Sequence, residues 1–189
     1  DLNLGGGYGV RYTDEDEAIN IPARLAELAA YLKEETERLG LPMPRFLMEP
    51  GRSIVADAGM TLYTVGSVKR IPGYKQYAAV DGGMTDNPRY ALYQSRYTVY
   101  HAHKSGSMER FDVVGRCCES GDIIQPGVEL PGDACRGDIL AVCTTGAYNY
   151  SMASNYNRLP RPAVVMLTPD RIYEAVRRET FADLTGLDL

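Results

Sequence analysis

A cysteine pair followed at once by a carboxylate is the feature of this sequence best suited to chemistry. Cys117 and Cys118 directly precede Glu119, and Gly121 marks a turn between two apolar stretches that we interpret as strands. A thiol can act as a nucleophile, or as a proton donor when its surroundings bring its pKa near the working pH. We therefore predict a reactive thiol at this turn, the alternative being two small buried hydrophobic residues.

Glycine and charged residues follow two short apolar runs earlier in the chain. Gly5, Gly6 and Gly7 come after a run that reads as a strand, and backbone N–H groups in such a loop can converge on an anion. Glu49 and Arg52 flank a Pro-Gly turn that would direct both side chains into one pocket. A tight loop and a surface ion pair are the alternative interpretations.

A polar segment over residues 148–157 is the third candidate for a functional region. Its part over residues 151–157 is too polar for the interior of a sheet, and Tyr148 before it has a phenol that supplies a neutral hydrogen-bond donor on a rigid ring. The alternative is a buried core tyrosine. Arg89, in residues 86–93, would by itself be interpreted as a loop cation.

The elements that must position these residues change in type near residue 52. A strand around Leu2 runs into the glycine loop, and apolar spacing predicts a helix from Ile21 to Leu39, with Asn20 as its cap and Gly40 at its exit. A short strand over residues 45–48 follows. This strand, loop, helix and strand order is the repeat of a βα barrel.

Short apolar runs separated by turn residues make up the rest of the chain. The predicted strands cover residues 53–56, 60–71, 76–80, 97–103, 110–114, 138–144 and 163–166, and the spacing over 170–187 predicts a helix that packs on the sheet. The fold class is therefore α/β plus all-β. Residues 1–52 are the incomplete end of a TIM-like (βα)8 barrel, since two units cannot close eight strands. Residues 53–189 are a mostly antiparallel β-barrel or sandwich domain with a terminal helix.

Composition narrows the class of protein. The 189 residues carry a net charge of −5, with the basic residues scattered, so no nucleic-acid partner is expected. No membrane span or leader is visible. The four cysteines read as reduced thiols of a cytoplasmic protein. No metal site is expected, and His101 and His103 are interpreted as surface strand histidines.

The motifs at residues 5–9, 49–52, 116–122 and 146–157, in this order, resemble the fold type III, pyridoxal-phosphate-dependent amino acid decarboxylases. The resemblance runs from residue 2 to about residue 157 and is strongest to members that convert meso-2,6-diaminopimelate to L-lysine and carbon dioxide. It implies a complete βα barrel followed by a β domain. It also implies a homodimer in which the Cys-Glu turn reaches into the partner's pocket.

The same resemblance implies a role for each candidate residue. The residues implied to bind pyridoxal phosphate are Gly5, Gly6, Gly7, Glu49, Gly51, Arg52 and Tyr148. The residues implied to bind the substrate are Arg52, Arg89, Tyr93, Glu119 and Tyr148. Cys118 would be the catalytic general acid. Relatives have a proline after the arginine, where this chain has Tyr90.

The cofactor of this family is held by a lysine Schiff base, and the sequence has no lysine in the family's early-strand setting. The lysines present are Lys33, Lys69, Lys75 and Lys104. We therefore expect that lysine to lie outside this sequence and the 189 residues to be inactive alone. Two alternatives remain: a related decarboxylase acting on ornithine, lysine, arginine or carboxynorspermidine, and a noncatalytic β-rich interaction module.

Overall fold

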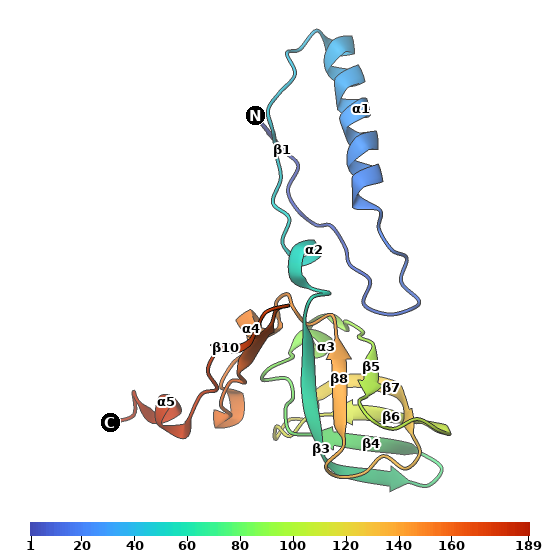
Figure 1. The fold of residues 1–189 in the computed structure, drawn as a ribbon, viewed down its shortest axis with the longest axis vertical. Helices are drawn as coiled ribbons and strands as arrows, with labels where there is room; N and C mark the ends of the chain where they lie inside the picture. Colours follow the sequence, from blue (N-terminus) through green and yellow to red (C-terminus); the bar gives the residue numbers. More distant parts are fainter.

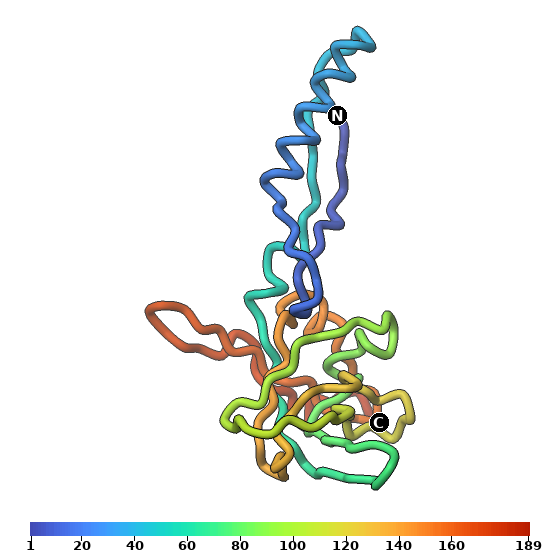
Figure 2. Tube along the Cα trace, turned by 90° about the vertical axis from the view of Figure 1, so that its right-hand side faces the viewer, coloured from blue at the N-terminus to red at the C-terminus, as the bar shows by residue number.

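The computed structural model describes residues 1–189, which form an N-terminal arm and a β domain (Figure 1). The arm holds β1 (Leu2–Asn3), α1 (Ile21–Leu39) and β2 (Phe46–Leu47). It projects from the β domain as a long extension in both views (Figure 2). β1 pairs with β2 in parallel, so the arm is a βαβ unit.

Helix α1 forms where the sequence places it, because both of its ends are capped. The side chain of Asn20 accepts a hydrogen bond of 3.1 Å from the backbone N–H of Ala23. Gly40 ends the helix in a left-handed conformation with φ of 66°. No residue of α1 is fully buried, and its apolar face, which includes Leu25 and Leu28, is half exposed.

The β domain is built around one strongly curled sheet. Its strands are β3 (Met60–Ile71), β4 (Lys75–Val80), β5 (Val99–His101), β6 (Met108–Val114), β7 (Ile123–Pro131) and β8 (Ile139–Cys143). Their order is β5-β8-β3-β4-β6-β7, with β4 and β6 parallel and the other neighbours antiparallel. The two end strands, β5 and β7, also contact each other, so the sheet curls into a nearly closed barrel.

The inner face of this curled sheet holds the core. Alternate residues on each strand point inward, as the period of a β-strand requires. The fully buried apolar side chains include Val65, Phe111, Val113, Ile124, Leu130, Leu140 and Val142. These residues bury the apolar surface that stabilises the domain and keep the loops at its ends in place.

Short elements connect the strands and form the C-terminal tail. They are α2 (Arg52–Val55), α3 (Arg89–Tyr93), α4 (Asn149–Met152), a 3-10 turn over Tyr156–Arg158, β9 (Val164–Leu167), β10 (Ile172–Val176) and α5 (Phe181–Thr185). β9 and β10 pair as a separate antiparallel hairpin beside the curled sheet (Figure 1). None of the helices combines the length and the apolar character needed to cross a membrane.

The strand predicted over residues 53–56 is wrong, because this segment is the helical turn α2. Ile54 and Val55 favour a strand by propensity. The turn is instead packed against Gly146, whose backbone N–H donates to Ala56 O at 2.9 Å. A Cβ at position 146 would lie 2.0 Å from Val55 O, so the two backbones touch directly. Tertiary contact outweighs local propensity here.

Three other differences concern the later part of the chain. Strand β7 was not predicted, because Pro126 and Gly127 interrupt the apolar pattern that indicates a strand. This strand lies at an end of the strand order, where proline is tolerated. The helix predicted over residues 170–187 is wrong over β10, which is a strand. Only α5 is helical in this region, and Thr180 caps it. The strand predicted over residues 97–103 shortens to β5, where the His101 side chain is 2% exposed and so is not a surface histidine.

Candidate active site

The glycine loop and Glu49 are brought together by the pairing of β1 with β2. The backbone N–H of Glu49 donates to Gly5 O at 2.9 Å. A Cβ on Gly6 would lie 2.2 Å from Glu49 O, so only glycine fits there. Asn3 connects the two segments, since its Nδ2 donates to Glu49 Oε1 at 2.6 Å and its Oδ1 accepts from Gly5 N at 2.8 Å. Sequence reasoning missed Asn3, although it directly precedes the loop.

Arg52 begins α2 at the junction between the arm and the β domain. Its guanidinium carbon lies 5.9 Å from the centre of the Tyr12 ring. Its Nε is buried and has no hydrogen-bond partner in this chain. The contact between α2 and Gly146 places Arg52 close to the segment that carries Tyr148. A buried guanidinium nitrogen without an acceptor is costly, so this position is suited to binding an anion.

Arg89 lies between two tyrosine rings at the start of α3. Its guanidinium carbon is 4.7 Å from the centre of the Tyr148 ring and 5.2 Å from that of Tyr93. Arg89 is only 9% exposed, and its Nε has no hydrogen-bond partner. Cation–π contacts at these distances stabilise the charge and orient the guanidinium. The structure thus brings three predicted site residues together, and Arg89 is a buried cation, not a loop cation.

Uncharged polar groups lie buried near Arg89. Both side-chain polar atoms of Asn87 and of Asn149 lack hydrogen-bond partners, as does the Tyr97 hydroxyl. Burial raises the pKa of the Tyr97 phenol, and the positive charge of Arg89 lowers it in part. Sequence reasoning assigned none of these residues a role, although Asn87 lies inside the predicted segment 86–93 and Asn149 inside the motif at residues 146–157. Buried polar groups normally have partners, so this cluster is suited to hydrogen-bonding with a further group.

Cys118 and Glu119 lie on an exposed turn that a second segment holds in place. The backbone N–H of Cys118 donates to Asn157 Oδ1 at 2.7 Å, and the Tyr156 hydroxyl donates to Glu119 Oε2 at 3.3 Å. The backbone N–H of Gly121, and then the Tyr156 hydroxyl, lower the pKa of Glu119. The turn therefore presents a free thiol beside an ionised carboxylate.

Asp122 anchors the base of this turn. It is 4% exposed, and its two oxygens accept from Met84 N and Cys117 N, both at 2.6 Å. Burial, and then the Asp122 charge, raise the pKa of the Cys117 thiol to about 11. Cys117 is therefore the packed member of the pair and Cys118 the exposed one. Sequence reasoning gave Asp122 no role, although it ends the motif.

The predicted site residues form separate groups within one chain. No hydrogen bond or ion pair joins Cys118 or Glu119 to Arg52, Arg89 or Tyr148.

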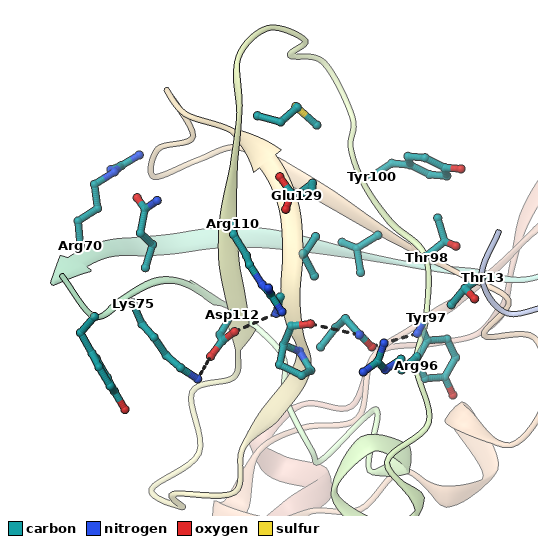
Figure 3. Close-up of a pocket in the computed structure, with 18 of the residues that line it drawn as sticks. Thr13, Arg70, Lys75, Arg96, Tyr97, Thr98, Tyr100, Arg110, Asp112 and Glu129 are labelled. Atoms are coloured by element: carbon teal, nitrogen blue, oxygen red, sulfur yellow. Dashed lines mark hydrogen bonds and ion pairs between the residues drawn. The ribbon is translucent and has the colours of Figure 1, made fainter. Parts of the chain in front are cut away.

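A cavity of about 1150 Å³ lies elsewhere in the β domain, between β5, β6, β7 and the β3–β4 hairpin (Figure 3). Arg96, Arg110 and Glu129 contribute to its lining, and Lys75 pairs with Asp112 at its edge at 2.6 Å. None of the predicted site residues lines this cavity. Its volume therefore gives no support to the predicted site.

A βαβ unit joined to a curled, mostly antiparallel sheet, with a thiol turn and a buried arginine at the sheet's ends, has the architecture of pyridoxal-phosphate-dependent decarboxylases. The chain belongs to the family described as pyridoxal-dependent decarboxylase, C-terminal sheet domain, which its residues 16–146 match.

Several relatives and solved structures similar to this chain are described as diaminopimelate decarboxylase. The diaminopimelate decarboxylase of Bacillus subtilis (strain 168) is 50% identical over 100% of this chain, which covers 43% of that protein. The crystal structure of diaminopimelate decarboxylase from M. jannaschi has a TM-score of 0.92 at 32% identity, over 99% of this chain and 42% of that one. The Helicobacter pylori enzyme complexed with L-lysine has a TM-score of 0.86 at 33% identity, over 98% of this chain and 44% of that one. The chain thus spans less than half the length of these relatives.

Proposed function

We propose that this chain is the C-terminal portion of a pyridoxal-phosphate-dependent enzyme that converts meso-2,6-diaminopimelate to L-lysine and carbon dioxide. The observation that carries the proposal is the turn at Cys118 and Glu119. It is exposed, held in place by Asn157 and Tyr156, and makes no hydrogen bond to the buried arginines of its own chain. A proton donor beside an ionised carboxylate suits a substrate with a second amino group. The arm would complete a βα barrel with residues outside this sequence.

The residues at the barrel end of the chain are suited to bind the cofactor. Pyridoxal phosphate, when bound, supplies an electron sink that makes loss of a carboxylate feasible. Backbone N–H groups of the glycine loop, residues 5–7, and the guanidinium of Arg52 would bind its phosphate. Glu49 would face the ring nitrogen and Tyr148 would donate to the phosphate. The unpartnered, buried Nε of Arg52 supports this assignment, because it requires an acceptor that this chain does not supply.

Arg89 and Glu119 would bind opposite ends of the substrate. Arg89, oriented by Tyr93 and Tyr148, would bind a substrate carboxylate. The Glu119 carboxylate, whose pKa is lowered further by the backbone N–H of Gly121 and the Tyr156 hydroxyl, would bind the distal ammonium group. The Helicobacter pylori relative was crystallised with L-lysine, and we infer the same product here.

Cys118 would deliver the proton that completes the reaction. Its thiol is exposed and its backbone is fixed, so it can be presented to the carbon that has lost carbon dioxide. In the full-length enzyme we expect Cys118→Ala to retain cofactor absorbance and to lose L-lysine release. Cys117→Ala is the matched control, because Cys117 is packed at the base of the turn. Unchanged turnover in Cys118→Ala would remove this residue from the mechanism.

We propose a homodimer in which the thiol turn of one chain enters the pocket of the other, because the turn is exposed and makes no hydrogen bond to the buried arginines of its own chain. We expect full-length Cys118→Ala and Arg52→Ala to be inactive alone. Mixed and refolded together, they should regain activity, because one pocket of each mixed dimer then has both residues intact. Absence of any recovery, with mixed dimers verified by differential tagging, would contradict a site shared between chains.

Turnover measured separately on each candidate amino acid tests which substrate the enzyme uses. Comparing kcat/KM for meso-diaminopimelate, ornithine, lysine, arginine and carboxynorspermidine should favour the first. Glu119→Gln should reduce that preference, because the distal ammonium loses its counter-ion. A higher kcat/KM for any of the others would overturn the assignment. Family membership argues against the noncatalytic interaction module.

The 189-residue chain alone should show no turnover. Lys75 and Lys104 are paired with Asp112 and Asp138 in the β domain, away from the glycine loop. Incubating the chain with pyridoxal phosphate and meso-diaminopimelate and measuring carbon dioxide checks this, and release of carbon dioxide would contradict it.

The free thiols of all four cysteines support a cytoplasmic location, where thiols stay reduced.

A further inference from the structure

A lysine and a cysteine outside the predicted site contact each other where two loops meet. Lys104, in the connection after β5, places Nζ 3.3 Å from Sγ of Cys135, in the connection between β7 and β8. Cys135 is exposed, and the Lys104 side chain is 28% exposed, so small oxidants can reach both atoms. The other cysteines form no hydrogen bond with a lysine.

A network of polar groups holds the two side chains together. Lys104 Nζ donates to Asp138 Oδ2 at 2.8 Å and to Asp133 O at 3.0 Å. Asp138 Oδ2 also accepts from the backbone N–H of Cys135 at 2.8 Å. His101 Nε2 lies 3.0 Å from the same oxygen, while His101 Nδ1 accepts from the backbone N–H of Lys104 at 2.9 Å. Because Asp138 contacts both partners, the short distance between nitrogen and sulfur is built into the fold.

We propose that Lys104 and Cys135 are an oxidant-sensitive modification site, at which peroxide joins Nζ to Sγ through one bridging oxygen atom. A separation of 3.3 Å leaves room for an oxygen between the two atoms after a small movement. A direct nitrogen–sulfur bond would require a much closer approach. Sulfur of an exposed cysteine beside a cation is the atom that peroxide oxidises first.

The chemistry balances with two molecules of peroxide. The first oxidises Cys135. An S–O bond forms, the O–O bond breaks, Cys135 becomes a sulfenic acid, and one water is released. The second oxidises the amine of Lys104. An N–O bond forms, the O–O bond breaks, the amine becomes a hydroxylamine, and one water is released. The hydroxylamine oxygen then attacks the sulfenic sulfur, and the hydroxyl on sulfur leaves as water. The products are the N–O–S bridge and three waters.

The second step requires the neutral amine, so bridging depends on pH. The hydrogen bond to Asp138 raises the pKa of Lys104, and burial opposes this in part. The charged or titratable groups that face Nζ are Asp138, Cys135 and, at 4.0 Å, the carboxylate of Asp133, with His101 behind Asp138. We therefore expect bridge formation to be faster in alkaline than in neutral solution.

Mass spectrometry of the purified protein tests the proposal without reference to its enzymatic activity. After treatment with hydrogen peroxide and digestion without reductant, we expect a linked peptide pair containing Lys104 and Cys135. Its mass should equal the sum of the two peptides plus one oxygen minus two hydrogens, and dithiothreitol should separate them. Unlinked sulfenic, sulfinic or sulfonic acid on Cys135 with no linked pair, or a pair without the oxygen, would overturn the proposal.

Matched variants establish that both side chains are required. Lys104→Arg keeps the positive charge but lacks the primary amine, and should form no bridge while its circular dichroism stays unchanged. Cys135→Ser should also form none. Lys75→Gln is the control, because Lys75 pairs with Asp112 and contacts no cysteine; it should bridge as the unaltered protein does. A bridge that persists in Lys104→Arg would overturn the assignment. These outcomes do not depend on the decarboxylase proposal, so either proposal can fail independently.

Discussion

The backbone N–H of Cys118 donates a hydrogen bond of 2.7 Å to the side-chain oxygen of Asn157, which lies 39 residues further along the chain. Asn157 has a φ of 56°, a left-handed conformation that asparagine adopts more readily than most residues. Its neighbour Tyr156 contacts Glu119. One short segment therefore positions both the thiol and the carboxylate of the turn.

Removing this contact should slow the proposed reaction. In the full-length enzyme, Asn157→Ala loses the acceptor and fits the left-handed backbone less well. We expect kcat to fall about tenfold, equivalent to ~1.4 kcal/mol in the barrier, with cofactor absorbance unchanged. Steady-state kinetics measure this. Asn157→Asp keeps an acceptor at the same place and should stay close to the unaltered enzyme. Equal losses in the two variants would show that the hydrogen bond does not position Cys118.

Replacing Asp122 should destabilise the β domain. In Asp122→Asn one acceptor oxygen becomes an NH2 group that faces a backbone N–H, so either Met84 N or Cys117 N loses its partner. We expect the free energy of unfolding in urea to fall by ~1–3 kcal/mol, the usual cost of a buried unsatisfied group. Asp57→Asn, at an exposed position without side-chain hydrogen bonds, should change it by less than ~0.5 kcal/mol. Similar midpoints for both variants would contradict the anchoring role.

The contact between α2 and Gly146 should not accept a methyl group. A Cβ in Gly146→Ala would lie 2.0 Å from Val55 O and 2.9 Å from Gly59 N, and neither is the end of a flexible side chain. We expect destabilisation of ~1–3 kcal/mol by thermal denaturation, because the backbones must separate.

Gly66→Ala is the control for this substitution. Its nearest atom would be Ala79 O at 3.7 Å, an ordinary contact, so its melting temperature should change little. If Gly146→Ala melts at the temperature of Gly66→Ala, the close approach of α2 is not required for stability.

The two neighbouring cysteines should differ in reactivity with pH. Burial, with the Asp122 charge, raises the pKa of Cys117 to about 11, so near neutral pH this residue stays a thiol and reacts slowly with iodoacetamide. The exposed Cys118 should be alkylated first. Raising the pH toward 11 increases the Cys117 thiolate and should narrow the difference. Pulse labelling followed by mass spectrometry measures both rates. Equal labelling at neutral pH would contradict the assignment of Cys117 as the packed member.

Local elements with strong sequence signals were predictable. The helix over Ile21–Leu39 and the long strand over Met60–Ile71 match the prediction at both ends, because caps, turn residues and periodic apolar residues all indicate the same boundaries. β7 and β10 were not predictable in this way. Proline and glycine interrupt the pattern of β7, and the spacing in β10 fits a helix as well as a strand, so pairing with neighbouring strands decides both.

The amino-acid sequence by itself determined the residue types available for chemistry and their order: the glycine loop, the arginines, the tyrosines and the Cys118-Glu119 turn. Only the tertiary structure decided their surroundings. It buries Arg89 between Tyr93 and Tyr148, and it holds the thiol turn against Asn157 and Tyr156. The physical reason is that motifs depend on local spacing, whereas burial and hydrogen-bond partners come from segments distant in the chain, which meet only when the sheet curls.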